Sequence, residues 1–349
     1  MRVALSLLTY VPGTTGGSEI YVRELTHELR RSGVDLLVLV NPSAAGAWHE
    51  VPTSIGGRGG AGRVGKLLRL AEATLHPGRL RSVLETADVV HYPLTVALPS
   101  VGRPSVTTLH DLQHRDLPQL FTRATRRYRA LAYDRAARSA DLVIVPSAFV
   151  RERAIALLGL DPARIVAIHH GVDHVRFRPA SDAREPFLLY PARPWPHKNH
   201  ARLLAALELL RRASPELRLV LTGAGTETFA GRPGVEARGA VPPEELVTLY
   251  RRASCLVFPS LYEGFGLPLL EAMACGTPVA AARASAIPEV CGDAAVLFDP
   301  ADAAAIASGV AEALQRTPEL GVLGLRQAAT FTWERAAAAH ESAYRAVAA

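Results

Sequence analysis

Short apolar runs alternate with longer amphipathic stretches along the whole chain. In the first half, runs of strand-like length cover 3–8, 36–40, 89–91, 106–109 and 142–145. In the second half, the same alternation gives runs at 187–190, 217–221, 255–258, 279–282 and 295–298. Strands that alternate with helices form a parallel sheet with helices on both faces. The pattern therefore predicts an α/β protein of two similar halves, each a Rossmann-like, doubly wound parallel sheet.

A chain of 349 residues is long enough for two domains, each with its own hydrophobic core. We interpret the segment 170–183, HGVDHVRFRPASDA, as the hinge between them. This predicts an N-terminal domain over 1–170 and a C-terminal domain over 171–331. Because ligands bind beyond the carboxyl ends of the strands in such sheets, two facing sheets predict one cleft between the domains.

The composition favours a cytoplasmic protein. No apolar stretch approaches the roughly 20 residues that a membrane-spanning helix needs. The run MRVALSLLTYVPG at the N-terminus resembles a first strand rather than a signal peptide. Cys255, Cys275 and Cys291 lack the spacing of a metal site. We therefore expect buried, reduced thiols and no structural zinc.

The segment 259–276, PSLYEGFGLPLLEAMACG, predicts a short helix with a polar entrance. Pro268 suits the first turn of a helix and Gly276 suits its end. The free N–H groups at the positive end of the helix dipole would belong to Phe265, Gly266 and Leu267. Glu263 precedes the helix and Glu271 lies about one turn inside it, so both carboxylates can bind the vicinal hydroxyls of one sugar-containing ligand. Solvated acids beside a helix N-terminus would give the same pattern.

Two cations precede another predicted helix in the second half. Arg193 and Lys198 lie on either side of a Pro-Trp-Pro sequence, so both side chains can project toward one anion. The chain has 39 lysines and arginines, and lysine occurs only at 66 and 198. This bias favours a specific need for a compact ammonium group at 198. A solvated pair of loop cations is the alternative.

Further candidates follow predicted strands. His110 comes after the run 106–109, where an imidazole can bind either a substrate or the backbone. Ser18 is a candidate N-cap for the helix that follows the first strand. Gly16 and Gly17 could allow a ligand to approach the backbone, or could form a plain turn. Gly223 ends another predicted strand and Val241 precedes a predicted helix, where any α/β protein places turn residues.

The run 259–300 resembles the signature of the retaining GT-B glycosyltransferases of family four. In that signature, two glutamates separated by seven residues flank a Gly-Phe-Gly turn, as Glu263 and Glu271 do here. The resemblance continues through Ala272, Cys275, Gly276, Pro278, Val279, Pro288 and Glu289. Matches elsewhere extend it over nearly the whole chain. The resemblance implies the GT-B fold, with a final helix of about 332–349 that packs back on the N-terminal domain.

The same resemblance implies roles in the second half of the chain. Arg193 and Lys198 would neutralise the diphosphate of a nucleotide-sugar donor. Glu271 would hold the ribose, and Glu263 would bind the donor sugar. The stretch 239–241, which includes Val241, would lie against the nucleotide base.

In the first half, the resemblance makes His110 a contact of the donor sugar near the reacting centre. The pair Gly16 and Gly17 matches the glycine loop of the family's N-terminal domain. The family implies transfer with retention of configuration, usually by attack on the same face that the leaving group occupies. No acidic DxD cluster follows a predicted strand, so we expect no metal ion and no cofactor besides the donor substrate.

Donor and acceptor are weakly encoded. The stretch 110–118, HDLQHRDLP, is similar to bacterial mannosyl- and rhamnosyltransferases of the family, so we expect a GDP-mannose-type or UDP-sugar donor. The acceptor would be a hydroxyl of a glycan, a lipid-linked sugar or a small molecule, as in polysaccharide biosynthesis. The net charge is +6, and the basic segment 121–141 could dock on the inner face of an anionic membrane. A solvated, arginine-rich helix would have the same composition.

Three other classes of function fit parts of the sequence. A sugar-nucleotide epimerase also uses two facing Rossmann-like domains, but the glutamates and cations fit transfer better. A phosphorylase that binds pyridoxal phosphate would have to use one of two lysines, Lys66 or Lys198. Positive charge alone suggests nucleic-acid binding, and no reading motif accompanies it. The segment Gly60–Lys66 imitates a phosphate-binding loop, but no apolar strand precedes it and Leu67 replaces the required Ser or Thr.

Overall fold

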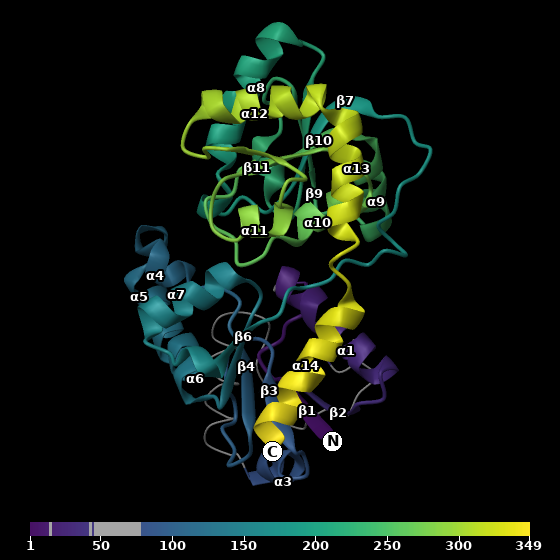
Figure 1. Cartoon of the computed structure of the whole chain (residues 1–349). Helices are drawn as coiled ribbons and strands as arrows, with labels where there is room; N and C mark the ends of the chain where they lie inside the picture. The colour runs from purple at the N-terminus through teal and green to yellow at the C-terminus, as the bar shows by residue number, and fades with distance from the viewer. Residues whose placement is uncertain (14–15, 42–43, 45–77) are drawn as a thin grey trace. The chain divides into compact units, whose positions relative to one another are not determined.

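The structure is a computed structural model that describes residues 1–13, 16–41, 44 and 78–349 (Figure 1). The segment Gly60–Lys66 lies outside the described residues. Contacts divide the chain into two compact units. Unit 1 comprises Met1–His170 and Trp333–Ala349, and unit 2 comprises Gly171–Thr332.

Unit 1 is built on a parallel sheet with the strand order β2-β1-β3-β4-β5-β6. Its strands are β1 (Arg2–Leu7), β2 (Asp35–Val40), β3 (Val89–Tyr92), β4 (Ser105–Thr108), β5 (Leu142–Val145) and β6 (Ile165–Ala167). Its α-helices are α1 (Gly17–Arg31), α3 (Gly78–Leu84), α4 (Gln113–Asp116), α5 (Arg123–Arg129), α6 (Arg135–Ser139), α7 (Ala148–Leu158) and α14 (Trp333–Ala348). A π-helical turn, Ala130–Asp134, joins α5 to α6.

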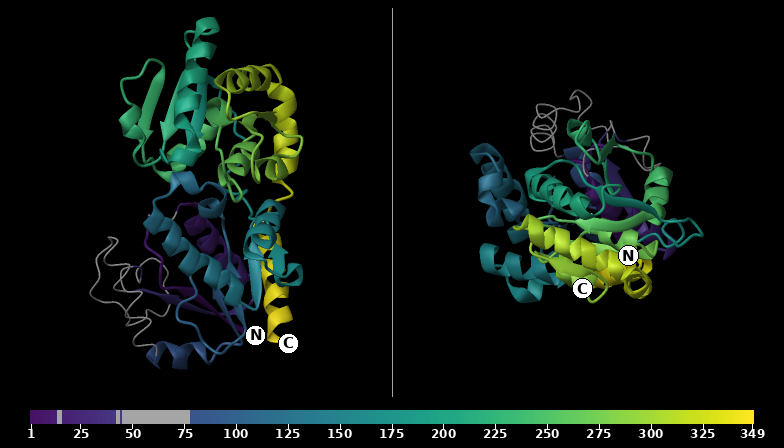
Figure 2. Two further views of the ribbon diagram at one scale, coloured as in Figure 1. Left: turned by 90° about the vertical axis from the view of Figure 1, so that its left-hand side faces the viewer. Right: turned by 90° about the horizontal axis from the view of Figure 1, so that it is seen from above.

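Helices cover both faces of this sheet, so its central strands β3 and β5 are buried along their whole length. All four residues of β5, LVIV, are buried, as expected for a central strand of a parallel sheet. One core cluster joins β5 and β6 to α6 and α7, and another joins β1, β2 and β3 to α3. Helices α1 and α14 pack against each other, and both termini lie at the same end of unit 1 (Figure 1 and Figure 2).

Unit 2 repeats the architecture with the strand order β12-β11-β10-β7-β8-β9, again all parallel. Its strands are β7 (Glu185–Pro191), β8 (Arg218–Thr222), β9 (Val235–Gly239), β10 (Ala253–Phe258), β11 (Val279–Ala282) and β12 (Val296–Phe298). Its α-helices are α8 (His200–Ala213), α9 (Pro243–Arg252), α10 (Leu267–Ala274), α11 (Ile287–Cys291), α12 (Ala303–Gln315) and α13 (Thr317–Ala328). Two parallel sheets covered by helices confirm the predicted fold class.

Among the strands of the described residues, the apolar runs located ten and missed two, β6 and β9. Both are edge strands, which bury only part of their surface and need not be apolar. Strand β6 has only three residues, and β9 has the polar sequence VEARG.

The helix after the first strand begins differently from the prediction. Ser18 was expected at the N-cap, but α1 already begins at Gly17 and Gly16 takes the cap position without a side-chain hydrogen bond. Gly16 has φ 57° and ψ −129°, a backbone conformation open to glycine and strained for other residues. The glycine pair therefore lets the helix start earlier than a serine cap would.

Among the described helices, none has the length and apolar character required to cross a bilayer. The three cysteines form no disulfide and are buried, and burial raises the pKa of each thiol to about 12. At neutral pH they are therefore protonated, weakly reactive core residues.

Candidate active site

The predicted turn into α10 is present, and glycine is required in it. Gly266 has φ 113°, and a Cβ there would lie 2.8 Å from Cδ1 of Leu269. Pro268 stands in the first turn of α10, and Gly276, with φ 70°, follows its end. The local signals of glycine and proline thus set both ends of the helix, and Phe265, Gly266 and Leu267 form its entrance.

Glu263, just before this turn, forms an ion pair with Lys198. Nζ of Lys198 lies 2.6 Å from Oε1 of Glu263, and both side chains are about six-sevenths buried, with 15% and 13% exposed. The backbone N–H of Glu263 donates to Oγ of Ser285 at 2.8 Å. Ser285 adopts φ 52°, a left-handed conformation that is costly for serine. The position of Glu263 is therefore fixed by its ion pair and by a strained neighbour.

The loop that carries Lys198 is held by a residue that the sequence did not identify as functional. Asn199 has φ 61°, and its Nδ2 donates to the carbonyl oxygens of Pro259 at 3.1 Å and Pro300 at 2.8 Å. Asparagine tolerates this left-handed conformation better than most residues. The buried amide thus joins the cationic loop to the loop that leads to Glu263.

A second connection runs through Tyr190. Its hydroxyl donates to the carbonyl oxygen of Lys198 at 2.8 Å and lies 3.0 Å from Oγ of Ser260. The N–H of Leu261 also donates to the carbonyl of His197 at 2.8 Å. These bonds hold the backbone on both sides of the Lys198–Glu263 ion pair, so the pair is preorganised.

Arg193 lies on the same loop, and Gly223 lies directly behind it. The Arg193 guanidinium is 5.8 Å from the centre of the Trp195 ring. Gly223, with φ 117°, would place a Cβ 3.0 Å from the carbonyl carbon of Ala192 and 3.1 Å from the nitrogen of Arg193. Gly223 is thus required for close packing of two backbone segments. Its N–H donates to the carbonyl of Gly239 at 2.6 Å, on the strand that leads to Val241.

Glu271 is nearly buried inside α10, and its partner is Tyr250 of α9. The Tyr250 hydroxyl donates to Oε2 of Glu271 at 2.6 Å, and Tyr250 itself is fully buried. Burial raises the pKa of Glu271 to about 7, while the bond from Tyr250 lowers it. Near neutral pH, this carboxyl is therefore partly ionised, and the carboxylate form can accept a hydrogen bond from a ligand. Tyr250 was not predicted, because nothing in the sequence shows that the tyrosine of α9 faces α10.

In unit 1, His110 is a neutral imidazole that follows the end of β4. Its Nε2 lies 2.7 Å from the carbonyl oxygen of Pro93, which can only accept, so Nε2 carries the proton. Burial lowers the pKa of His110, which leaves Nδ1 as an acceptor at neutral pH. The ring of Tyr21 packs edge-on against it, with ring centres 5.2 Å apart.

A chain of hydrogen bonds behind His110 ties α14 to the sheet. Nδ1 of His340 lies 2.7 Å from the carbonyl oxygen of Ala336, so this nitrogen donates. Burial lowers the pKa of His340 to about 4, and Nε2 of the neutral ring must accept from the Tyr21 hydroxyl at 2.8 Å. Tyr21 then accepts from the hydroxyl of Thr108 at 2.9 Å.

The remaining bonds of this chain are fixed in the same direction. Thr108, having donated to Tyr21, accepts from Nε2 of His91 at 2.8 Å. Nδ1 of His91 then accepts from the Tyr344 hydroxyl, also at 2.8 Å. Every partner is buried, so this chain of hydrogen bonds specifies how α14 docks on α1, β3 and β4. Its member on β4, Thr108, lies two residues before His110.

The predicted site residues fall into both units. Lys198 and Glu263 are brought into direct contact, whereas Gly16, Gly17 and His110 belong to unit 1 and the others to unit 2. His114, which follows His110 closely in sequence, forms a buried pair with Asp134 at 2.9 Å and serves the packing of unit 1. Among the described residues, no group of three or more His, Cys, Asp or Glu side chains could hold a metal ion.

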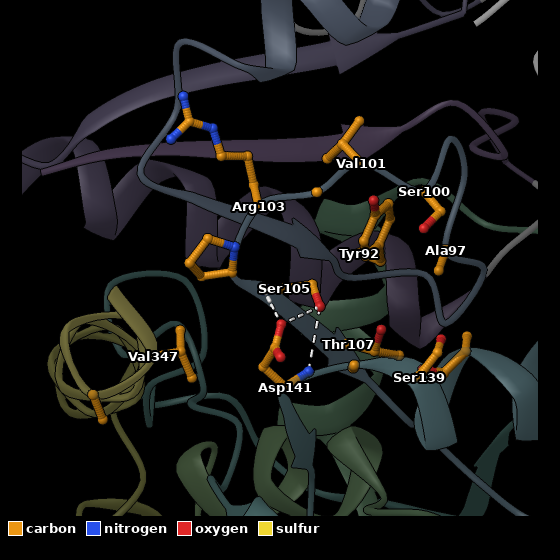
Figure 3. A pocket seen from close by; sticks show the side chains of 15 residues that line it. Tyr92, Ala97, Ser100, Val101, Arg103, Ser105, Thr107, Ser139, Asp141 and Val347 are labelled. Atoms are coloured by element: carbon orange, nitrogen blue, oxygen red, sulfur yellow. Dashed lines mark hydrogen bonds between the residues drawn. The ribbon is translucent and has the colours of Figure 1, made fainter. Parts of the chain in front are cut away.

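A pocket of about 650 Å³ in unit 1 contains none of the predicted residues (Figure 3). Ser105 and Asp141, which line it at the amino ends of β4 and β5, are hydrogen-bonded to each other at 2.8 Å. Ligands of open parallel sheets bind at the opposite, carboxyl ends of the strands. The carboxyl-edge residues therefore remain the candidate active site.

Comparisons with known proteins agree with this geometry. The model of the glycosyl transferases group 1 family matches residues 172–324, and that of glycosyltransferase family 4 matches residues 15–176. The O-antigen chain mannosyltransferase B of Escherichia coli is 32% identical over 305 residues, which cover 80% of each chain. The alpha-maltose-1-phosphate synthase of Mycolicibacterium smegmatis is 28% identical over the full length of both chains.

Solved structures show the same fold. Sucrose-phosphate synthase from Thermosynechococcus elongatus superposes with a TM-score of 0.81 at 23% identity over 99% of both chains. A HepE structure from Anabaena in complex with UDP and glucose gives a TM-score of 0.74 at 17% identity, over 99% of this chain and 100% of the other. The chain therefore belongs to the family 4 glycosyltransferases and is a glycosyltransferase of the GT-B type.

Proposed function

We propose that the protein transfers a hexose from a nucleotide diphosphate sugar to a hydroxyl group of a glycan, a lipid-linked sugar or a small molecule, with retention of configuration. The observation that carries this proposal is the preorganised pair of Lys198 and Glu263 beside the entrance of α10. The Lys198 ammonium can bind a phosphate, and the Glu263 carboxylate can accept hydrogen bonds from sugar hydroxyls. Hydrogen bonds to the backbone hold both groups in place, so the pair suits a ligand that has both a phosphate and a sugar.

We assign the binding of the donor nucleotide to unit 2. Glu271 would accept hydrogen bonds from the ribose hydroxyls through the oxygen that Tyr250 does not use. The stretch that ends in Val241 would lie against the base, and Gly223 would hold the cationic loop in place. In unit 1, Gly16 and Gly17 would allow the backbone to approach the diphosphate.

The chemistry would then proceed in one displacement. The bond between the anomeric carbon and the diphosphate oxygen breaks, and the acceptor oxygen bonds to the same face of that carbon. The acceptor proton goes to the departing phosphate oxygen. Arg193 and Lys198 would stabilise the charge that builds on the leaving diphosphate, while Glu263, released from Lys198, would accept from a donor-sugar hydroxyl. His110 would accept from another sugar hydroxyl through Nδ1.

Arg193 and Lys198 can neutralise the diphosphate without a metal ion, so we propose transfer that needs no metal and no cofactor. For the donor, the mannosyltransferase relative favours a GDP-mannose-type sugar, and the UDP-bound HepE structure favours a UDP-sugar. An O-antigen chain mannosyltransferase among the relatives supports a glycan acceptor and a role in polysaccharide synthesis. We further propose that this synthesis takes place on the cytoplasmic side of the membrane.

A screen of GDP- and UDP-sugars for thermal stabilisation tests the donor, because a ligand of the folded state raises the melting temperature. Stabilisation by one nucleotide series, followed by transfer to a saccharide acceptor with an unchanged anomeric configuration by NMR, would support the proposal. Turnover that survives EDTA would support metal independence. Release of an epimerised sugar without any acceptor would instead indicate an epimerase.

A further inference from the structure

One helical stretch of unit 1 holds most of the net charge of the chain. Helix α5, the π-helical turn and α6 follow one another without interruption from Arg123 to Ser139. Six arginines against one aspartate give this stretch a net charge of +5, and the whole chain has +6. The charge is thus concentrated on one element rather than spread over the surface.

The inner side of this stretch is apolar or neutralised. Ala136 and Ala137 are buried, and Asp134 is fully buried between His114 and Arg115. Arg129 pairs with Asp111 at 3.1 Å. The only acid of the stretch is therefore already neutralised and cannot balance the outward arginines.

The outer side, which we call the arginine face, consists of Arg123, Arg126, Arg127, Tyr128, Leu131 and Arg135. All six side chains are exposed. The four arginines form no ion pair and no side-chain hydrogen bond with any described residue. An arginine without an acidic partner is free to bind an external anion, and guanidinium groups bind phosphate bidentately.

An apolar residue stands in the middle of this face. Leu131 is 71% exposed, and Arg127 and Arg135 lie four residues before and after it. Tyr128, 39% exposed, lies beside it. Nucleic acid or an acidic protein would be attracted by the arginines, but neither gives a reason for an exposed leucine at the centre. A bilayer does, since apolar side chains enter the headgroup boundary while flanking cations bind lipid phosphates.

We propose that the arginine face docks the protein on a membrane surface that contains anionic lipid. The α5 to α6 stretch lies at the side of unit 1, away from α1 and α14 (Figure 1). Docking through this face would hold unit 1 at a bilayer where lipid-linked acceptors are found. The contact is electrostatic and superficial, so it is reversible and sensitive to salt.

Co-sedimentation with vesicles tests the proposal on the full chain. We expect binding to vesicles of phosphatidylcholine mixed with phosphatidylglycerol, weak binding to phosphatidylcholine alone, and release at high salt. The double variant Arg126→Glu/Arg127→Glu should lower partitioning by at least about tenfold, since each basic residue near an anionic surface contributes a severalfold factor. Arg212→Glu/Arg326→Glu, on α8 and α13, changes the net charge equally at exposed positions and should lower it by less than about threefold.

A second pair of variants leaves the charge unchanged. Leu131→Ser should reduce partitioning severalfold, because it removes the inserted side chain. Val322→Ser, at a site that is 51% exposed on α13, should have no effect. Transfer to a water-soluble acceptor should be the same in all variants, so a failure of docking is distinguishable from a failure of catalysis.

Three results would overturn the proposal. The first is equal binding to neutral and anionic vesicles, or binding to neither. The second is an equal loss in the variants of unit 2. The third is salt-sensitive binding to duplex DNA without binding to vesicles, which would make the arginine face a nucleic-acid surface.

Discussion

The hydrogen bond from Tyr250 to Glu271 makes nucleotide affinity depend on pH in a way that Tyr250→Phe should shift. The pKa of Glu271 is about 7, raised by burial and held down by this 2.6 Å bond. A hydrogen bond to a charged group contributes about 1.5–3 kcal/mol. Removing the hydroxyl should therefore raise the pKa of Glu271 by a further one to two units or so, at about 1.4 kcal/mol per unit.

The effect on binding follows from the ionised fraction. If the ionised carboxylate binds the ribose, about half of the wild-type protein is competent at pH 7, since the pKa is about 7. With the pKa at about 8–9, the competent fraction of the variant falls to roughly a tenth or a hundredth. Nucleotide affinity at neutral pH should then fall about fivefold to fiftyfold, and the loss should disappear above about pH 10.

Calorimetric titration of GDP and UDP over this pH range measures the shift. The ratio of wild-type to variant affinity is the useful quantity, because titration of the ligand's own phosphate cancels in it. Tyr92→Phe serves as a control, since it removes another buried hydroxyl, bonded to the carbonyl of Pro99 at 2.6 Å and remote in sequence from Glu271. A ratio that does not change with pH would refute the role of Tyr250, whereas absence of any nucleotide binding by the wild type would refute the donor site itself.

Other substitutions test the remaining parts of the account. Glu271→Gln should abolish ribose recognition and stabilise the fold above pH 7 by on the order of 3 kcal/mol, because the raised pKa of about 7 means that the ionised form is disfavoured by burial. This gain should shrink as the pH falls and vanish below the ordinary carboxyl pKa of about 4.5, which thermal melts at both pH values can check. Lys198→Ala should lower kcat by roughly a hundredfold to a thousandfold, as loss of one preorganised electrostatic contact does; an unchanged kcat would exclude its role at the leaving group. Asn199→Gly keeps the left-handed backbone but removes two buried hydrogen bonds, and should cost about 1–3 kcal/mol in denaturant unfolding; a loss below the error would mean that Asn199 does not hold the loop.

Local signals were sufficient for the α10 turn. Gly276 follows the helix end and Pro268 lies in its first turn, as the sequence predicts, and Gly266 at the entrance adopts a positive φ. Such features depend on the conformational preferences of single residues, which can be recognised without any tertiary contact. The ends of the short helix, and thus the positions of Glu263 and Glu271 along it, could therefore be predicted.

Features that depend on distant contacts could not be predicted. Asn199 holds the cationic loop because its amide reaches the carbonyl of Pro300. Tyr250 bonds to Glu271 because α9 is rotated so that this side chain faces α10. The direction of hydrogen bonding from Tyr344 to His340 likewise needs four elements to be in place. Even the start of α1 depended on whether Gly16 or Ser18 took the cap, a choice that the backbone of Gly16 decides.

The central claim is that unit 2 binds the donor nucleotide, and its most direct test is a crystal structure with a bound nucleoside diphosphate. We predict that the ribose hydroxyls donate to Glu271 while Tyr250 keeps its bond to the other carboxylate oxygen. We also predict that Arg193 and Lys198 contact the diphosphate, with the Lys198–Glu263 distance lengthened from 2.6 Å. A nucleotide bound elsewhere, or one that leaves Glu271 and Lys198 without contact, would contradict the account.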